Sequence, residues 1–112
     1  MVVKAKAPQR GEVISIDFNP VRGHEQAGKR PAVVISPSIY NLKSGLALVC
    51  PITSHSKGYP FEILFEESKF KGVILTDQIR MIDWRERKFR TMGNLSAHTL
   101  ELVKNRIKLL VD

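Results

Sequence analysis

The chain has 112 residues, of which 43% are hydrophobic, and it carries 18 Lys and Arg against 11 Asp and Glu, a net charge of +7. This length suits one domain with a modest core. No apolar run approaches the roughly 20 residues of a membrane helix, and residues 1–8 lack the apolar stretch of a signal peptide. We therefore expect a cytoplasmic protein with no membrane segment. The basic balance favours a polyanionic partner: RNA, DNA or an acidic protein segment.

Cysteine and histidine usage gives no sign of a metal site. The single cysteine, Cys50, excludes an intramolecular disulfide, and its apolar neighbours predict a buried, inert thiol. His55 and His98 have no companions at ligand spacing, so the sequence predicts neither a metal ion nor another cofactor.

Short apolar segments separated by turn residues fill most of the chain. Residues 1–10 are expected to form a flexible N-terminal arm, and residues 11–112 a single domain. Alternating apolar and polar residues predict a first strand over 12–18. The β-branched run 32–35 predicts a strand buried on both faces, and a helical or turn segment is expected at 38–42.

The middle of the chain continues this pattern. The strand expected over 46–52 must bulge or leave the sheet at Pro51, because proline cannot donate to the ladder. A charged turn is expected at 66–72 and a basic turn at 84–87. The remaining predicted strands span residues 61–65, 73–78, 80–83 and 88–92.

The last element has the clearest signal, that of a helix. Ser96 is a suitable N-cap, and Leu95 and Leu100 have the spacing of a hydrophobic staple. An apolar stripe follows at helical spacing, made of Leu100, Val103, Ile107 and Leu110. We expect this helix to pack on the sheet or on a partner subunit. The elements together predict a mainly β fold, a small barrel or curled sheet with a C-terminal helix.

Two polar loops follow predicted strands, and closure of the sheet would bring them together. The second loop spans 53–60. The first loop spans 19–31 and combines an imidazole, a carboxylate and a guanidinium, which are groups that move a proton beside a phosphate. These groups belong to His24, Glu25 and Arg30, and the same loop also carries Gln26 and Lys29. An ordinary solvated hairpin loop is the alternative.

Ordered motifs along the chain match one family. The sequence closely resembles the MazF/PemK toxins of bacterial toxin–antitoxin pairs from about residue 11 onward. Each motif alone is common, but the ordered set at matching spacing is specific. The motifs are Gly11-Glu12-Val13, Asp17-Phe18-Asn19-Pro20, Gly23-His24-Glu25-Gln26, Gly28, Arg30-Pro31-Ala32-Val33-Val34, Cys50-Pro51-Ile52-Thr53-Ser54, Ser56-Lys57-Gly58-Tyr59-Pro60-Phe61, Gly72-Val73 and Asp77-Gln78-Ile79-Arg80.

This resemblance implies an SH3-like small β-barrel with a C-terminal helix, as in the MazF, PemK and CcdB toxins, that works as a homodimer. It implies a metal-independent, sequence-specific endoribonuclease that acts on single-stranded RNA, chiefly messenger RNA. The ribose 2′-hydroxyl attacks, leaving a 2′,3′-cyclic phosphate and a 5′-hydroxyl. A cognate antitoxin is implied as well, covering the RNA site with a flexible acidic segment.

The catalytic candidates follow from the family positions and their chemistry. Arg30 falls at the family's loop arginine, and a guanidinium binds a phosphate bidentately. Thr53 falls at its catalytic threonine, whose hydroxyl can donate to a phosphate oxygen. Glu25 is a candidate base or a positioner of Arg30, and His24 an auxiliary proton carrier. The structural alternatives are a salt-bridged arginine, a strand-end threonine that caps a backbone group and a surface carboxylate.

RNA contacts are expected from both ends of the site. Lys57 and Tyr59 suit phosphate contact and base stacking, with a lid over the core as the alternative for Tyr59. One plasmid-borne branch of the family places an arginine two residues before Asp77, where this chain has Leu75, so the aspartate is expected to read bases or hold the strand end. The full set of predicted RNA-binding residues is Lys29, Ser54, Lys57, Tyr59, Asp77 and Gln78.

Trp84 and two rival functions complete the predictions. Trp84 lies among arginines and is expected to stack on bases or to anchor a protein partner such as an acidic antitoxin tail. The gyrase-poison family shares the fold without nuclease chemistry, but this chain lacks its aromatic-apolar tail. A basic scaffold that only binds RNA or protein is the other rival.

Overall fold

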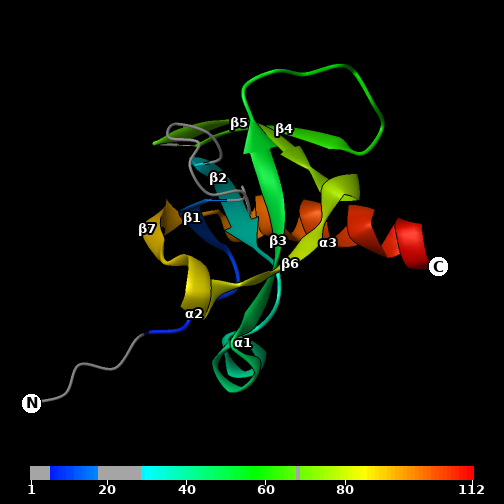
Figure 1. Cartoon of the computed structure of the whole chain (residues 1–112). Coiled ribbons are helices and arrows are strands. Elements are labelled where there is room, and N and C mark those ends of the chain that lie inside the picture. Colours follow the sequence, from blue (N-terminus) through cyan, green and yellow to red (C-terminus); the bar gives the residue numbers. More distant parts are fainter. Residues whose placement is uncertain (1–5, 18–28, 68) are drawn as a thin grey trace, which may run out of the picture.

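The computed structural model describes residues 6–17, 29–67 and 69–112 (Figure 1). Within them, the predicted mainly β fold with a C-terminal helix is confirmed, as a curled antiparallel sheet. The elements in chain order are β1 (Glu12–Asp17), β2 (Lys29–Val34), α1 (Ser38–Ser44), β3 (Leu46–Thr53), β4 (Glu62–Glu67), β5 (Phe70–Leu75), the 3-10 turn η1 (Thr76–Gln78), β6 (Arg80–Asp83), α2 (Trp84–Arg87), β7 (Phe89–Asn94) and α3 (Ala97–Val111).

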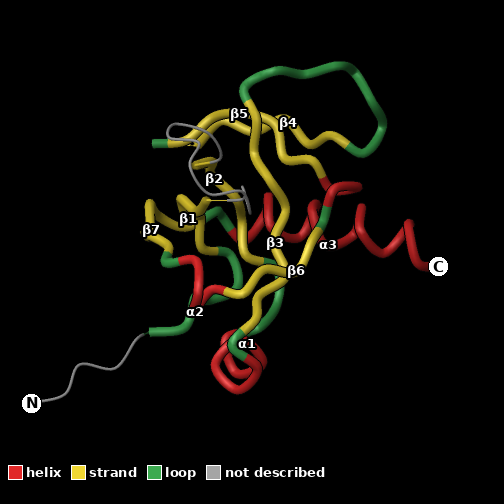
Figure 2. The backbone as a smooth tube through the Cα atoms, in the orientation of Figure 1, coloured by secondary structure: helices red, strands yellow, loops and turns green. Residues whose placement is uncertain are grey.

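The sheet is arranged around β3, which has partners on both edges (Figure 2). The strand order is β4-β5-β3-β2-β1-β7, and β6 pairs with the first half of β3. Pro51 lies opposite Ala32 of β2, and pairing with β5 begins at the next residue, Ile52. The departure expected at Pro51 is therefore a change of partner, and the strand continues to Thr53.

Alternate residues of the central strands supply two separate hydrophobic layers, as the β-branched run of β2 predicts. Val33 belongs to the layer under α3, whereas Ala32 and Val34 belong to the layer on the opposite face, and all three are fully buried. The layer under α3 comprises Val13, Val33, Ile35, Cys50, Ile52, Ile63, Ile74, Leu95 and Val103. The opposite layer comprises Ile14, Ile16, Ala32, Val34, Ala47, Val49, Ile82 and Trp84.

Helix α3 covers one face of the sheet, and its predicted start is confirmed. The Ser96 hydroxyl caps the helix by accepting from the Thr99 N–H at 3.2 Å. Val103 is fully buried, but Leu110 at the end of the expected stripe is 44% exposed, because the last turn extends beyond the sheet (Figure 1). The longest helix in the described part of the chain has 15 residues, and none there is long and apolar enough to cross a membrane.

The hairpin made by β4 and β5 has longer strands than the charge pattern predicts. The expected charged turn at 66–72 is wrong: β4 runs to Glu67 and β5 starts at Phe70, with Glu66 opposite Lys71. The charges of Glu66 and Lys71 lie on the solvent side of two paired strands, so they do not mark a loop. The strand expected over 73–78 ends at Leu75, where the 3-10 turn begins.

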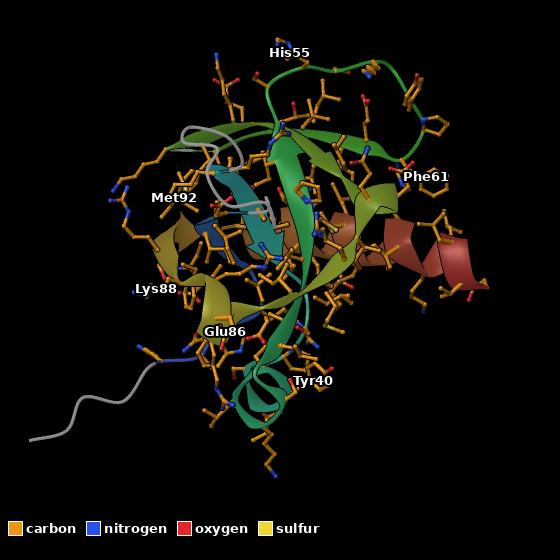
Figure 3. All side chains as sticks on the ribbon, in the orientation of Figure 1. Tyr40, His55, Phe61, Glu86, Lys88 and Met92 are labelled. Carbon is orange, nitrogen blue, oxygen red and sulfur yellow. The ribbon has the colours of Figure 1, made fainter. Side chains whose placement is uncertain are left out.

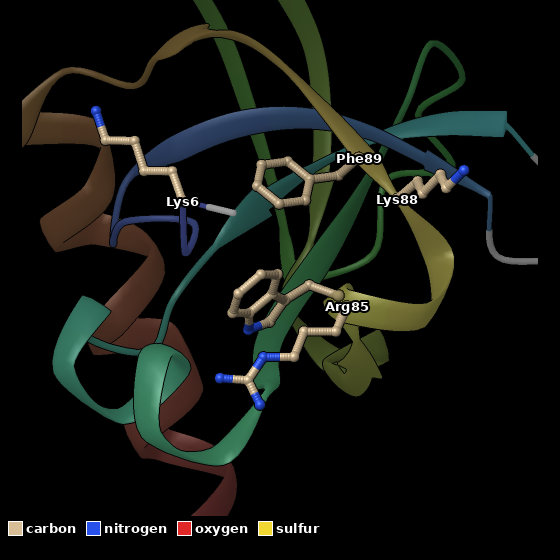
Figure 4. A pocket seen from close by; sticks show the side chains of 5 residues that line it. Lys6, Arg85, Lys88 and Phe89 are labelled. Atoms are coloured by element: carbon tan, nitrogen blue, oxygen red, sulfur yellow. The ribbon is translucent and has the colours of Figure 1, made fainter. Parts of the chain in front are cut away.

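Trp84 is part of the core, so both roles expected for it are wrong. It is the first residue of the short helix α2 and is 3% exposed. Its indole N–H donates to the Asn41 carbonyl at 2.9 Å, and its ring meets Phe89 edge-on. The guanidinium of Arg85 lies 5.1 Å from the ring centroid. Figure 4 shows Arg85 and Phe89 beside the cavity that they help to line.

The segment before β1 packs against the sheet from Ala7 onward, although it falls within the expected arm. Ala7 contacts the layer that contains Trp84, and Pro8 is fully buried. The Pro8 carbonyl accepts a hydrogen bond of 2.8 Å from the side-chain amide of the fully buried Asn41. That amide also donates to the Ser36 carbonyl at 3.0 Å, and its oxygen accepts from the Ser36 hydroxyl. Asn41 thus joins α1, the N-terminal segment and the link between β2 and α1.

Replacing Asn41 by alanine is expected to lower the free energy of unfolding by about 2–3 kcal/mol, because buried carbonyls of Pro8 and Ser36 lose their donor. Urea denaturation followed by circular dichroism measures this. Asn105→Ala, at an exposed position of α3, is the matched control and is expected to change stability by less than about 0.5 kcal/mol. Equal effects of the two substitutions would contradict the role of Asn41.

Candidate active site

The start of β2 and the end of β3 form the centre of the site. Ala32 pairs with Pro51 and Val33 with Cys50 in antiparallel register. Arg30 lies two residues before Ala32 on β2, and Thr53 lies two residues after Pro51 on β3. The two side chains line the same two cavities, as the resemblance implies for a shared site.

The first cavity lies under the loop that joins β3 to β4, and we call it the loop-side cavity. Its volume is about 350 Å³, within the range of small-molecule sites. In Figure 3 this loop leaves β3 near His55 and returns near Phe61. The lining residues are Arg30, Thr53, His55, Lys57, Tyr59, Glu62, Leu75, Asp77 and Gln78.

The second cavity lies against the strands, and we call it the sheet-side cavity. It has a volume of about 400 Å³ and adds the cation of Lys71 on β5. Its lining residues are Arg30, Pro31, Ile52, Thr53, Ser54, His55 and Lys71. The site therefore has two compartments that meet at Arg30, Thr53 and His55.

Two contacts fix Thr53 at this boundary. Its hydroxyl oxygen accepts a hydrogen bond of 3.3 Å from the backbone N–H of His55, so the hydroxyl proton remains available to donate elsewhere. Its backbone packs directly on β5: a Cβ added to Gly72 would lie 2.9 Å from the Thr53 carbonyl oxygen. Only glycine permits this approach without displacing one strand.

Glu62, the first residue of β4, shapes the loop, and the sequence analysis missed it. It is 9% exposed, and its carboxylate accepts from the Ser56 hydroxyl at 2.8 Å and from the N–H groups of Lys57 and Gly58 at 3.1 Å. Gly58 adopts a positive φ of 76°, which turns the chain toward these contacts. The sequence signal that could have identified Glu62 is an acidic residue a few positions after a Ser-Lys-Gly turn.

These hydrogen bonds decide the charge of Glu62. Burial alone would raise the pKa of its carboxyl, but the Ser56 hydroxyl and the backbone N–H groups of Lys57, Gly58 and Tyr59 outweigh burial and hold the pKa below the ordinary value of 4.5. Glu62 is therefore an anion near neutral pH.

The far end of the loop is attached to neighbouring elements. A guanidinium N–H of Arg106, on α3, donates to the Pro60 carbonyl. The Thr76 hydroxyl, on the 3-10 turn, donates to the Phe61 carbonyl at 2.6 Å. Helix α3 and η1 thus hold the return of the loop to the sheet.

The predicted RNA-binding residues separate into three groups. Lys57, Tyr59, Asp77 and Gln78 share the loop-side cavity with the Arg30–Thr53 pair, and Ser54 lines the sheet-side cavity. Tyr59 is 59% exposed, so it does not act as a lid over the core. Lys29 is exposed at the start of β2, outside both lining sets. His24 and Glu25 lie outside the described residues.

The remaining predictions concern cysteine and metals. Cys50 is fully buried, and burial followed by the negative charge of Asp77 raises its pKa to about 12, so the expected inert thiol is confirmed. In residues 6–17, 29–67 and 69–112, no group of three or more His, Cys, Asp or Glu side chains is placed to hold a metal ion.

Comparison with known proteins gives a consistent result over almost the whole chain. Residues 9–111 match the family model of the PemK-like, MazF-like toxins of type II toxin–antitoxin systems. The endoribonuclease toxin MazF of Escherichia coli K12 is 44% identical over 110 residues, which cover 98% of this chain and 99% of that relative. Endoribonuclease MazF9 of Mycobacterium tuberculosis is 35% identical over 114 residues, covering 93% and 96% of the two chains.

Solved structures agree with the sequence match. MazF from Deinococcus radiodurans superimposes with a TM-score of 0.83 at 40% identity, covering 94% of this chain and 96% of that one. A MazE–MazF structure from the same organism gives a TM-score of 0.81 at 35% identity, covering 94% and 95%. The chain therefore belongs to the PemK-like, MazF-like toxin family of type II toxin–antitoxin systems, in which the relatives named above are endoribonucleases.

Proposed function

We propose that this toxin cleaves single-stranded RNA, chiefly messenger RNA, at a short sequence and without a metal ion, through attack of the ribose 2′-hydroxyl. The observation that carries the proposal is that Arg30 and Thr53 line the same two cavities, at the boundary where these cavities meet. A phosphodiester bound at that boundary places one flanking nucleotide in each cavity.

The two side chains suit the transition state of this reaction. As the 2′-oxygen attacks phosphorus, negative charge grows on the non-bridging oxygens, and the Arg30 guanidinium stabilises it by bidentate contact. The Thr53 hydroxyl donates to the same oxygens. The P–O5′ bond then breaks, giving a 2′,3′-cyclic phosphate and a 5′-hydroxyl. Glu25 as base and His24 as an auxiliary proton carrier remain proposals that rest on the family resemblance.

The loop between β3 and β4 supplies RNA contacts. Lys57 pairs with a backbone phosphate, and the exposed ring of Tyr59 stacks on a base. Asp77 and Gln78, both exposed on η1, reach base edges through a carboxylate and an amide. Ser54 and Lys29 extend the contacts beyond the scissile phosphate.

Partners follow from charge and from the relatives. The net charge of +7 favours an acidic ligand, and solved relatives include a MazE–MazF structure. We therefore propose a homodimer in the cytoplasm whose cognate antitoxin covers the RNA site with a flexible acidic segment.

The reaction is tested with purified protein and a long natural RNA in EDTA, with the ends of the products mapped. We expect cuts at one short motif, ending in a cyclic phosphate, and a loss of about 100-fold or more for Arg30→Ala. Arg90→Ala is the matched control, because Arg90 is an exposed strand arginine on β7 that lines neither cavity. Intact RNA with folded wild-type protein would refute the proposal.

Thr53→Val keeps the shape of the side chain but removes the hydroxyl, so we expect the single-turnover cleavage rate to fall by about 100-fold. Thr53→Ser keeps the donor and is expected to retain most of the rate. Equal rates for the valine and serine variants would show that the hydroxyl does not act in catalysis.

Glu62→Gln is expected to loosen the loop, because the neutral amide replaces an acceptor of several hydrogen bonds. Trypsin should then cut after Lys57 several-fold faster, and the KM for RNA should rise more than kcat falls. Glu66→Gln, at an exposed position of the same strand, is the control.

The pH dependence has a defined sign. Because the pKa of Glu62 is lowered, its contacts are fully present above the ordinary carboxyl value of 4.5 and are lost as the pH falls through the lowered pKa. At acid pH, an acid-active protease should cut the loop of the wild-type protein faster than at neutral pH. This increase in the cleavage rate should be absent in Glu62→Gln. An identical acid response in both proteins would contradict this account.

A further inference from the structure

The ring of Tyr59 lines the loop-side cavity without support from the core. Its side chain is 59% exposed and belongs to neither hydrophobic layer. The position of the ring therefore depends on the hydrogen bonds of the backbone around it. We propose that Arg106, on α3, is a positioning residue that holds Tyr59 in place for RNA binding, a proposal that rests on the ribonuclease function given above.

The backbone that follows this ring is held at three consecutive carbonyl groups, each by a different element. The first, of Tyr59, accepts a hydrogen bond of 3.1 Å from the N–H of Glu62 at the start of β4. The third, of Phe61, accepts from the N–H and the hydroxyl of Thr76 on η1, at 3.1 and 2.6 Å. Both of these donors belong to the sheet or to the turn that continues it.

The carbonyl between these two, that of Pro60, is bound by the helix instead. It accepts a hydrogen bond from the guanidinium of Arg106. A guanidinium keeps its positive charge in proteins, so this hydrogen bond is charge-assisted. Proline has no N–H, so the carbonyl is the only backbone group of residue 60 that can form a hydrogen bond. Loss of Arg106 therefore leaves the residue next to Tyr59 without its backbone partner.

Helix α3 gives Arg106 a fixed base. Val103, one turn earlier, is fully buried, and the next residue, Ile107, packs against the hydrophobic layer under α3. The guanidinium therefore extends from a helix whose position is set by the core (Figure 1). Arg106 itself lines neither cavity, so its effect on RNA passes through the loop.

Both walls of the loop-side cavity depend on this arrangement. Thr76 binds the loop and is followed by Asp77 and Gln78, which line the same cavity as Tyr59. Because Arg106 holds the return of the loop, the ring stays close to these side chains in the absence of RNA. The cavity is thus formed in advance, and RNA binding does not have to order the loop.

Hydrogen–deuterium exchange without RNA measures the loop directly. In Arg106→Ala we expect the amides of residues 54–61 to exchange several-fold faster than in wild type, whereas the amides of β3 stay protected and show that the variant is folded. Arg106→Lys keeps a cationic donor and should restore most of the protection. Lys108→Ala, which removes an exposed cation from the same helix, is the matched control and should exchange as wild type does.

RNA binding tests the functional part of the proposal. The ligand is an RNA that carries the mapped motif, with 2′-deoxyribose at the cleavage site. We expect Arg106→Ala to raise its dissociation constant about tenfold, within the range of one lost base stack, and to change the single-turnover rate at saturating cleavable RNA less than about twofold. In a Tyr59→Ala background, Arg106→Ala should raise the dissociation constant by no more than about twofold.

Salt dependence separates positioning from a direct contact with RNA. Each phosphate contact of a single strand contributes about 0.7 to the slope of log affinity against log salt concentration. The lost hydrogen bond ends on a protein carbonyl, so Arg106→Ala should have the same slope as Lys108→Ala, which carries the same net charge.

Three results would overturn the role of Arg106: wild-type exchange of the loop in Arg106→Ala, an equal loss of affinity with and without the Tyr59 ring, or a slope lower by about 0.7 than that of Lys108→Ala. If the wild-type protein neither binds nor cuts RNA, the ribonuclease function is refuted. The exchange measurement still shows in that case whether Arg106 holds the loop, so the two failures are distinguishable.

Discussion

The antiparallel register between β2 and β3 is the constraint on which the site depends. It pairs Ala32 with Pro51, and Arg30, at the start of one strand, lines the same two cavities as Thr53, at the end of the next. A slip of one residue would turn Thr53 to the other face of the sheet. Such a slip is resisted because β3 is paired on both edges, with β2 on one side and with β5 and β6 on the other.

Two of the three carboxylates of β4, those of Glu62 and Glu67, give this strand a role beyond the sheet. Glu62 at its start binds N–H groups of the loop. Glu67 at its end accepts from the N–H and hydroxyl of Ser96 at 2.8 and 2.7 Å and also from the Thr99 hydroxyl. Burial opposes ionisation of Glu67, but the Thr99 and Ser96 hydrogen bonds and the charge of His98 hold its pKa below 4.5. One strand thus orders both the loop and the start of α3.

Sequence patterns predicted the elements whose signal is local. The alternation of β1, the apolar run of β2 and the Ser96 cap each depend on neighbours in the chain. Family motifs, together with the exits of two strands, placed Arg30 beside Thr53. Glu62 was not predicted and the roles predicted for Trp84 were wrong, because the roles of both residues depend on distant partners: the fold of a loop in one case and the Asn41 carbonyl in the other. The charged residues likewise predicted a turn where the structure has a paired hairpin, with Glu66 opposite Lys71.

The attachment of the loop at both ends has an evolutionary consequence. Glu62 holds its first half, while Arg106 and Thr76 hold its return. Between these anchors the side chain of Tyr59 is open to solvent, and it contributes nothing to the hydrophobic layers of the sheet. Mutations at such positions change stability little, so the side chains at the loop tip can diversify while the strands that carry Arg30 and Thr53 stay unchanged.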